Sequence, residues 1–382
     1  MDLNKPITER RRQTRSSIYL YLYRHNGFCS KKMLASDMEL SLPTVYQNLT
    51  ELIDAGLVGY SGEQRSTGGR RANGLDILPG ARIAVGISVT DSRIRMSVAD
   101  LRLRELCYRS LKYAPISDFA RFSTQLAREL EVFLDDNGID RSRLLGVGIA
   151  VPGILSADGD SLLYAPTLKM HNLPLSVLRS AIPYPVYLQN DATCGGYAEW
   201  FIRNRDTKTD SSTNMAYLSL ESGVGGAIMI GGTLYGGNQL RGGEFGHMCV
   251  EAGGMPCRCG RKGCLEAYCS AMRISNELGI PLDVFFADLQ NGNTQYDTLW
   301  EDVLRHLAIG INNINMVLDC GVVLGGFLAQ YLEPYLPKLR QYVAEGNTFA
   351  ENGDFVEISR LKNHSVPLGA ALYYIKDFIE SV

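Results

Sequence analysis

The sequence predicts an α/β protein that begins with a small, mainly helical head. Three helix-length patterns with capping residues occupy the first 56 residues. From Ala81 onward, short apolar runs such as ARIAVGISV and LLGVGIAVPG alternate with helical segments, which is typical of α/β architecture. A second series of strands starts at MAYLSL and ends at CGVVLGG. With 382 residues, 45% of them hydrophobic, the chain is long enough for two or three domains.

The first two helices of the head are predicted from apolar spacing and capping. The run from 8 to 24 places Ile18 and Leu22 at helical spacing, and Asn26 with the glycine after it ends the run. Ser30 can then cap a second, shorter helix.

The third helix of the head carries polar side chains suited to a nucleic acid. Ser41 and Pro43 open this helix, and its apolar stripe leaves Thr44, Gln47 and Asn48 on the other face. Short polar side chains of this kind suit base edges in a major groove. These three are therefore the candidate DNA-reading residues.

A hairpin pattern with a basic, glycine-rich tip follows the three helices. The tip STGGRR contains Arg70 and Arg71, and paired arginines on such a tip suit phosphates or a minor groove. The pattern predicts a winged helix-turn-helix domain over residues 1–74 and a linker over 75–80. The alternative is a three-helix bundle with an ordinary polar face and a solvated loop.

Charge is distributed unevenly along the chain. Residues 1–74 hold eleven Lys/Arg and seven Asp/Glu, so the remainder carries a net charge of −7 within the total of −3. A basic head on an acidic body suggests that only the head meets a polyanion such as DNA.

The segment CRCGRKGC, residues 257–264, places three thiols within eight residues. No apolar run approaches the ~20 residues of a membrane span, and the start of the chain lacks the apolar core of a secretory signal. We therefore expect a cytoplasmic protein without a membrane partner. In such a protein a tight cysteine cluster is more typical of a metal site than of disulfides.

Six motifs of the body occur in the order typical of one known family. They are GVGIAVPG, LQNDATCGGYAE, GVGGAIMIGGTLYGG, GGEFGHM, CRCGRKGCLEAY and VVLGG. In these motifs residues 81–382 resemble the ROK family of repressors, open reading frames and kinases, and the head with its STGGRR tip resembles the repressor branch. The resemblance implies a two-lobed actin/hexokinase-like (ribonuclease H-like) sugar-kinase fold.

The resemblance also implies one structural zinc ion per chain, bound by His247, Cys257, Cys259 and Cys264. The chemistry agrees, because three thiolates and one imidazole form a closed tetrahedral site with no open position for water. The alternative is a reduced cysteine cluster without metal.

A sugar pocket is the next implication of the resemblance. The residues implied are Gly153, Asn190, Asp191, Glu244, His247 and Glu266. Zinc on one ring nitrogen of His247 would leave the other N–H as an oriented donor to a sugar hydroxyl. Carboxylates can each accept several hydrogen bonds, which suits a ligand with many hydroxyls. For each Glu alone a surface salt bridge is the alternative, but their placement around the metal motif favours the pocket.

The nucleotide motifs of the family's kinases are altered in this chain. In a kinase Asp191 would be the general base, but the first phosphate motif, Asp-x-Gly-Gly-Thr, is replaced by SVTDS at 88–92. The second phosphate loop contains Glu221, and Phe327 replaces the third glycine of the adenosine motif. Added carboxylates repel nucleotide phosphates, so we expect no enzymatic activity and no catalytic residues.

The sequence therefore predicts a sugar-responsive transcriptional regulator, most simply a repressor. It would bind operator DNA and a sugar effector and act as a homodimer or a larger homo-oligomer. One alternative is an active ATP-dependent sugar kinase fused to a DNA-binding domain, and another is a DNA-bound scaffold for a second protein. The sugar itself is not predicted, because the chain departs from the family pattern near Thr167.

Overall fold

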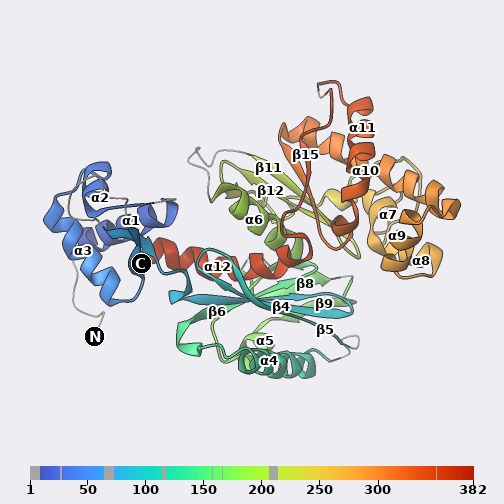
Figure 1. The fold of residues 1–382 in the computed structure, drawn as a ribbon. Helices are drawn as coiled ribbons and strands as arrows, with labels where there is room; N and C mark the ends of the chain where they lie inside the picture. Colours follow the sequence, from blue (N-terminus) through green and yellow to red (C-terminus); the bar gives the residue numbers. More distant parts are fainter. Residues whose placement is uncertain are drawn as a thin grey trace.

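The described residues form a head and a body that is built mainly on two five-stranded sheets (Figure 1). The computed structural model describes residues 9–25, 28–63, 73–113, 118–156, 158–165, 167–205, 214–349 and 351–382. Each large sheet forms one lobe, and helices α6 (Asp191–Asn204) and α12 (Ser365–Ser381) lie between the lobes. This arrangement confirms the two-lobed α/β fold expected from the sequence.

The described residues of the head form three helices and an antiparallel hairpin. Its elements are α1 (Glu9–Arg24), α2 (Lys31–Asp37), α3 (Leu42–Asp54), β1 (Val58–Glu63) and β2 (Asn73–Ile77). As expected, Ser30 and Ser41 cap α2 and α3. Their hydroxyls accept hydrogen bonds from the backbone N–H groups of Met33 and Thr44, at 3.2 and 3.3 Å. Each cap satisfies a donor that the first helical turn leaves unpaired.

The expected linker over 75–80 is wrong in its first half. Strand β2 continues to Ile77, which pairs with Val58, while Leu75 pairs with Tyr60. The N–H of Leu75 also donates to the carbonyl of Cys29 at 2.7 Å. Because these residues fill the ladder of the hairpin, the head extends to Ile77, and a 3₁₀ turn over Pro79–Ala81 leads into the body.

The first lobe is built on a mixed sheet with the strand order β10-β6-β3-β4-β5. Its strands are β3 (Ile83–Val89), β4 (Arg93–Asp100), β5 (Glu105–Lys112), β6 (Leu144–Val151) and β10 (Val186–Asn190). Helices α4 (Phe119–Asp136) and α5 (Ser176–Ala181) cover its outer face. A small sheet of β7 (Ile154–Leu155), β8 (Ser161–Ala165) and β9 (Met170–Pro174) extends from the end of β6.

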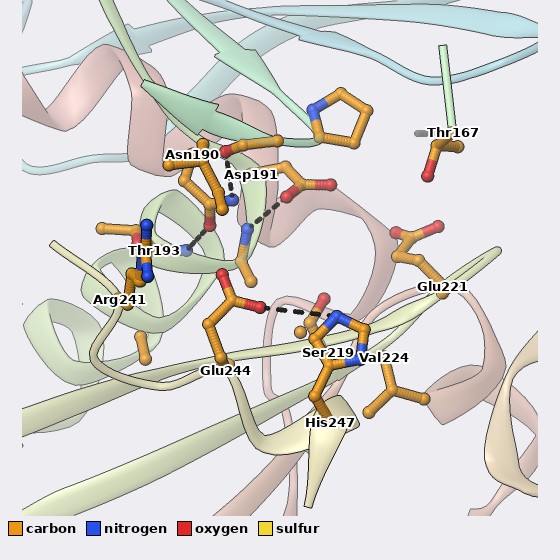
Figure 2. A pocket seen from close by; sticks show the side chains of 18 of the residues that line it. Thr167, Asn190, Asp191, Thr193, Ser219, Glu221, Val224, Arg241, Glu244 and His247 are labelled. Carbon is orange, nitrogen blue, oxygen red and sulfur yellow. Dashed lines mark hydrogen bonds and ion pairs between the residues drawn. The ribbon is translucent and has the colours of Figure 1, made fainter. Parts of the chain in front are cut away.

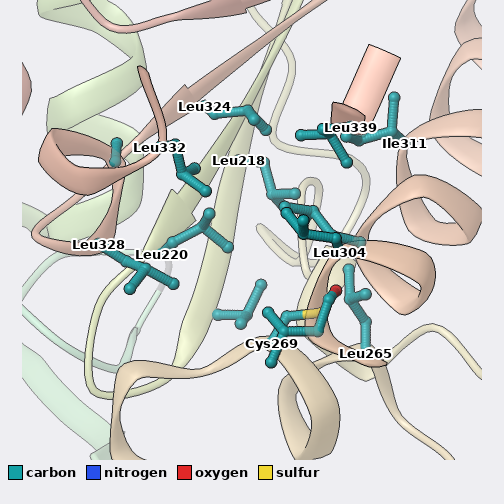
Figure 3. Close-up of a cluster of buried hydrophobic side chains, with 14 of the residues drawn as sticks. Leu218, Leu220, Leu265, Cys269, Leu304, Ile311, Leu324, Leu328, Leu332 and Leu339 are labelled. Carbon is teal, nitrogen blue, oxygen red and sulfur yellow. The ribbon is translucent and has the colours of Figure 1, made fainter. Parts of the chain in front are cut away.

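The second lobe has a sheet with the order β13-β12-β11-β14-β15. Its strands are β11 (Met215–Leu220), β12 (Val224–Ile230), β13 (Thr233–Leu234), β14 (Gly321–Gly325) and β15 (Val356–Ile358). Its helices are α7 (Leu265–Cys269), α8 (Ala271–Leu278), α9 (Leu282–Gln290), α10 (Asp297–Leu318) and α11 (Leu336–Gly346). Figure 3 shows the buried contact between this sheet and its helices, where Leu218 and Leu324 of the sheet face Leu304 and Ile311 of α10.

Helix α12 packs against the first sheet so closely that two strand positions have room only for glycine. A Cβ atom at Gly86 would lie 1.6 Å from the carbonyl oxygen of Pro367, and one at Gly148 would lie 1.9 Å from that of Ala370. The backbone approach therefore explains both glycines in the otherwise apolar strands β3 and β6.

The head is docked on the C-terminal end of α12 (Figure 1). Ile375 and Ile379 share a hydrophobic core with Leu22 of α1, and the rings of Tyr19 and Phe378 meet edge to face with centroids 6.4 Å apart. One apolar core therefore joins the head to the body. Among the described helices, none has the length and the apolar composition that a membrane crossing requires.

Candidate functional site

A cleft of about 600 Å³ opens between the two lobes at the start of α6 (Figure 2). All of the residues expected to bind a sugar line its wall: Gly153, Asn190, Asp191, Glu244, His247 and Glu266. Thr167, where the chain departs from the family pattern, also lines the cleft. The volume falls within the usual range for small-molecule sites.

Asn190 connects the turn after β6 to the first turn of α6. Its side-chain amide donates to the carbonyl of Gly153 at 3.1 Å, and its amide oxygen accepts from the N–H of Thr193 at 3.0 Å. Asn190 is therefore the cap of α6 as well as a cleft residue. This double role holds the Gly153 turn beside the helix start.

Asp191, the next residue, places a carboxylate in the cleft. One of its oxygens accepts a hydrogen bond from the N–H of Ala192 at 2.8 Å. Burial raises the pKa of Asp191 to about 6, and the nearby carboxylate of Glu221 adds to the rise, whereas Ala192 N–H and Arg95 oppose it. Near neutral pH the carboxylate is an acceptor for ligand hydroxyls.

Glu244 and His247 approach the cleft from the segment that follows β13. The Nε2 atom of His247 lies 3.9 Å from a carboxylate oxygen of Glu244 (Figure 2). Burial raises the pKa of Glu244, and His247 opposes this shift. Both side chains are directed to the same space, so one ligand can contact both.

The ligand atoms of His247, Cys257, Cys259 and Cys264 all lie within 4.8 Å of one another. The sulfurs of Cys259 and Cys264 are 3.7 Å apart, and the sulfur of Cys257 is 3.9 Å from Nδ1 of His247. Tetrahedral coordination with metal–sulfur bonds of about 2.3 Å requires sulfur–sulfur separations of about 3.8 Å. The cluster therefore fits a tetrahedral metal ion. In His247, Nδ1 faces the thiols and Nε2 faces Glu244. This orientation matches the expectation that one ring nitrogen is directed to the metal and the other to the ligand.

Glu266 is held on both of its carboxylate oxygens. One accepts from the N–H of Val224 at 3.0 Å, and the other forms an ion pair with Arg258 at 3.1 Å. Sequence reasoning missed Arg258, although it lies between two expected metal ligands. Its guanidinium lies close to Gly223, where an added Cβ would come within 2.8 Å of Nη2.

Arg95 is the second residue that the sequence analysis missed. It lies on β4 and forms an ion pair with Glu221 at 3.1 Å, although the two residues belong to different lobes. The negative charge that Glu221 was expected to add to the second phosphate loop is therefore balanced by Arg95. A charged residue inside an apolar strand pattern, IRMSV, was the available signal.

The candidate DNA-reading residues differ in exposure. Gln47 is exposed and Thr44 is half-buried, with its hydroxyl 2.8 Å from that of Ser41. Asn48 is only 2% exposed, and its amide donates to the carbonyl of Thr44 at 2.8 Å, so its expected place on the outer face is wrong. It follows Val45 by three residues and precedes Leu52 by four, which puts it beside the apolar stripe.

Two further exposed residues of α3 were not predicted. Tyr46 is 51% exposed and Thr50 is also exposed. The ammonium group of Lys31 lies 4.1 Å from the centre of the Tyr46 ring, which adds a cation beside this face. Arg70 and Arg71 of the hairpin tip lie outside the described residues.

Two curated relatives match this chain over most of their length. The xylose repressor of Caldicellulosiruptor bescii is 26% identical over 385 residues, covering 93% of this chain and 93% of the repressor. The N-acetylglucosamine repressor of Escherichia coli O157:H7 is 24% identical over 364 residues, covering 87% of this chain and 85% of the repressor.

Two solved structures show the same fold. A ROK family transcriptional regulator, a homologue of the Escherichia coli MLC protein, aligns with a TM-score of 0.75 at 21% identity over 98% of both chains. The ROK glucokinase of Streptomyces griseus, in complex with glucose and AMPPNP, aligns with a TM-score of 0.64 at 20% identity. That alignment covers 76% of this chain and 98% of the glucokinase. The ROK family model matches residues 104–377, most of the body, and the chain therefore belongs to the ROK family.

Proposed function

We propose that this protein is a sugar-responsive transcriptional regulator, most simply a repressor, that binds operator DNA through its head and a sugar in the cleft. One observation carries the proposal. The six residues expected for a sugar line one cleft, in a chain whose head has three helices and a hairpin. The match to a protein named xylose repressor, which covers 93% of both chains, supports the combination of a DNA-binding head with a sugar-binding cleft.

The polar groups of the cleft support a polyhydroxylated ligand. Asp191 and Glu244 offer carboxylate oxygens from opposite walls, and His247 can donate from Nε2. A sugar hydroxyl can donate to a carboxylate and accept from an N–H at the same time. The hydrogen bonds that already fix Asn190 and Glu266 keep the walls in place before a ligand arrives.

We propose that the metal of the His/Cys₃ cluster is zinc. The donor set supports this choice, because three soft thiolates with one imidazole are typical of closed structural zinc sites. Zinc there would fix the orientation of His247 and hold the segment between Glu244 and Glu266. All four tetrahedral positions would be taken by protein ligands, so its role would be structural.

The loss of kinase activity is also part of the proposal. Two arginine side chains lie at the loop that corresponds to the second phosphate motif: Arg95 pairs with Glu221, and Arg258 lies beside Gly223. Both arginines are already engaged by carboxylates, so they are poor substitutes for a loop of backbone N–H groups facing phosphate. The alternative function is an ATP-dependent sugar kinase that carries a DNA-binding head.

The head contributes Gln47, Thr44 and Tyr46 to the proposed DNA-facing surface of α3. We place Arg70 and Arg71 at the phosphates or the minor groove beside it, as their sequence suggests. A helix-turn-helix protein usually reads two half-sites as a dimer, so we propose at least a homodimer built through the body.

A sugar panel followed by a DNA titration tests the proposal. Thermal shifts with D-xylose, D-glucose, N-acetyl-D-glucosamine and the 6-phosphates of the two hexoses should identify a ligand. Operator DNA is then selected by the full chain from a random library, and its affinity is measured by fluorescence anisotropy with and without that ligand. We expect the sugar to change operator affinity at least fivefold in the wild type and not in Asp191→Ala. Asp136→Ala, an exposed aspartate on α4, is the matched control.

Two other outcomes identify the alternatives. Sugar phosphate formed from ATP, and abolished in Asp191→Asn, would identify a kinase. Specific DNA binding with no thermal shift from any sugar would favour a scaffold for another protein.

A further inference from the structure

Arg95 connects three parts of the body that are distant in the sequence. From β4 in the first lobe, its Nη2 atom meets Glu221 at the end of β11 in the second lobe, at 3.1 Å. Its Nη1 atom donates at 3.2 Å to the carbonyl of Asn363, which lies two residues before α12. One guanidinium thus bridges both lobes and the start of the helix between them.

This ion pair is buried, and stability alone is a weak reason for it. The side chains of Arg95 and Glu221 are 6% and 16% exposed. Nε of Arg95 and the hydroxyl of Ser88, the residue directly opposite on β3, have no hydrogen-bond partner among the described residues. Burial of such groups costs free energy, and a buried ion pair often contributes no more stability than apolar residues of similar size. What the pair does supply is a fixed position of one lobe relative to the other.

Arg95 acts on the cleft from behind its wall. Glu221 and Asp191 line the cleft, whereas Arg95 is not among the lining residues. Burial alone would lower the pKa of Arg95, but the ion pair with Glu221 and, less strongly, the nearby Asp191 raise it, so the positive charge of Arg95 offsets both carboxylates. A change at Arg95 would therefore affect a sugar only through Asp191, Glu221 and the spacing of the lobes.

The far end of α12 carries the head. The helix has 17 residues, or about 25 Å of length at about 1.5 Å per residue. Asn363 precedes its first turn, while Ile375 and Ile379 near its last turns share a core with α1 of the head. A shift of the start of α12 relative to the second lobe is thus passed to the head by a rigid element.

We propose that the Arg95–Glu221 pair is an inter-lobe latch, which couples the spacing of the lobes around the cleft to the position of α12 and hence of the head. Its regulatory meaning rests on the proposed function, because a sugar that favours one lobe spacing would favour one position of the two DNA-binding heads. Arg95 is a positioning residue in this scheme and Glu221 is its partner in the second lobe.

Hydrogen exchange tests the latch without any ligand or DNA. The proteins are the full-length wild type, Arg95→Met and Glu221→Gln, each checked for folding by circular dichroism. Arg93→Met is the matched control, since Arg93 lies on the same strand but is exposed and contacts Ser110. We expect exchange in residues 362–370 to rise at least threefold in the two latch variants and to stay unchanged in the control. Unchanged exchange in a folded Arg95→Met protein would overturn the latch, whether or not the protein responds to a sugar.

Operator titration then tests the coupling. In the wild type we expect saturating sugar to change operator affinity at least fivefold. In Arg95→Met we expect this change to be largely lost, while the sugar still binds. Arg95→Lys should restore part of the change, and the double variant Arg95→Met/Glu221→Gln should be no worse than either single variant. A full wild-type change in Arg95→Met would show that the coupling does not pass through this pair. A wild type without any sugar response would instead contradict the proposed function, while the exchange result still decides the latch.

Discussion

At the scale of single residues, Asp191 gives the cleft a carboxylate, and the burial of that charge lowers the stability of the folded protein. The raised pKa of Asp191 means that the folded state binds this proton more tightly than the unfolded chain does. The protonated carboxyl group of Asp191 therefore adds to the free energy of unfolding at low pH, and this contribution is lost as the pH rises to about 6. Glu221 on the β11–β12 turn increases this cost, and Arg95 on β4 reduces it.

Asp191→Asn should accordingly make the protein more stable above pH 6 and leave its stability near pH 4 unchanged. Asparagine has no charge to bury, and its side-chain oxygen can still accept the N–H of Ala192. We expect a gain on the order of 1 kcal/mol at pH 7.5, measured by urea denaturation at both pH values. An equal gain at pH 4 would show that the ionised carboxylate is not the cause.

Cys259→Ser should remove the metal and lower both the melting temperature and the sugar affinity. Loss of one of four ligands breaks the closed tetrahedron, and the support of His247 is lost with it. Metal content per chain is measured by mass spectrometry, and melting by calorimetry. Cys249→Ser is the control, because Cys249 is exposed and outside the cluster. A full metal complement in Cys259→Ser would exclude this thiol as a ligand.

At the scale of elements, α6 is held by the buried carboxylate of Glu199, the last residue of the LQNDATCGGYAE motif, to which the sequence analysis assigned no role. Glu199 is fully buried, bonds Arg203 on the same helix, and accepts from the hydroxyl of Ser359 at 2.9 Å and the N–H of Arg360 at 2.9 Å. These bonds attach α6, whose first residues form the cleft, to the segment after β15.

Glu199→Ala should cost about 3 kcal/mol, because it leaves Nε of Arg203 and the donors of Ser359 and Arg360 without their acceptor. Glu357→Ala is the matched control, since Glu357 pairs with the same Arg203 but is 52% exposed, and we expect a loss of less than about 1 kcal/mol. Chemical denaturation at pH 7 compares the two. Equal losses would mean that the buried network contributes nothing beyond a surface ion pair.

The second prediction at the scale of elements concerns the polar residues of α3. Gln47→Ala should change which bases are preferred, because Gln47 is exposed on the outer face of α3. Asn48→Ala should instead lower stability with little change in preference, because Asn48 is buried. Selection from a random DNA library with each variant gives the preferences. An unchanged preference in Gln47→Ala would exclude this residue from base reading.

At the scale of the whole molecule, the head and the body are parts of one packed structure. Removal of the first 77 residues exposes Ile375, Phe378 and Ile379 of α12, which the head covers. We expect the fragment 78–382 to melt at a lower temperature than the full chain and to aggregate, because a contiguous apolar patch becomes exposed. Calorimetry and light scattering measure both effects. Phe378→Ser/Ile379→Ser in the fragment should reduce aggregation, and a dispersed fragment with unchanged melting would contradict the shared core.

The sequence by itself determined the features that depend on short spacings. Ser30 and Ser41 cap their helices within three residues, and the metal cluster needs Cys257, Cys259 and Cys264 within eight residues. The six cleft residues were predicted through motifs, each of which is local. The burial of Asn48, which the sequence prediction missed, could also have been predicted, because helical periodicity places this residue next to the apolar stripe.

Only the tertiary structure decided which distant charges meet. Arg95 and Glu221 are 126 residues apart in the sequence, and no local spacing relates them. The same holds for the head on α12, where Tyr19 meets Phe378, and for Glu199 with Ser359. Secondary structure depends on hydrogen bonds and apolar periods within a few residues, whereas these contacts depend on how whole elements pack. The pattern of one strand or helix therefore cannot show which partner will neutralise its charge or cover its apolar face.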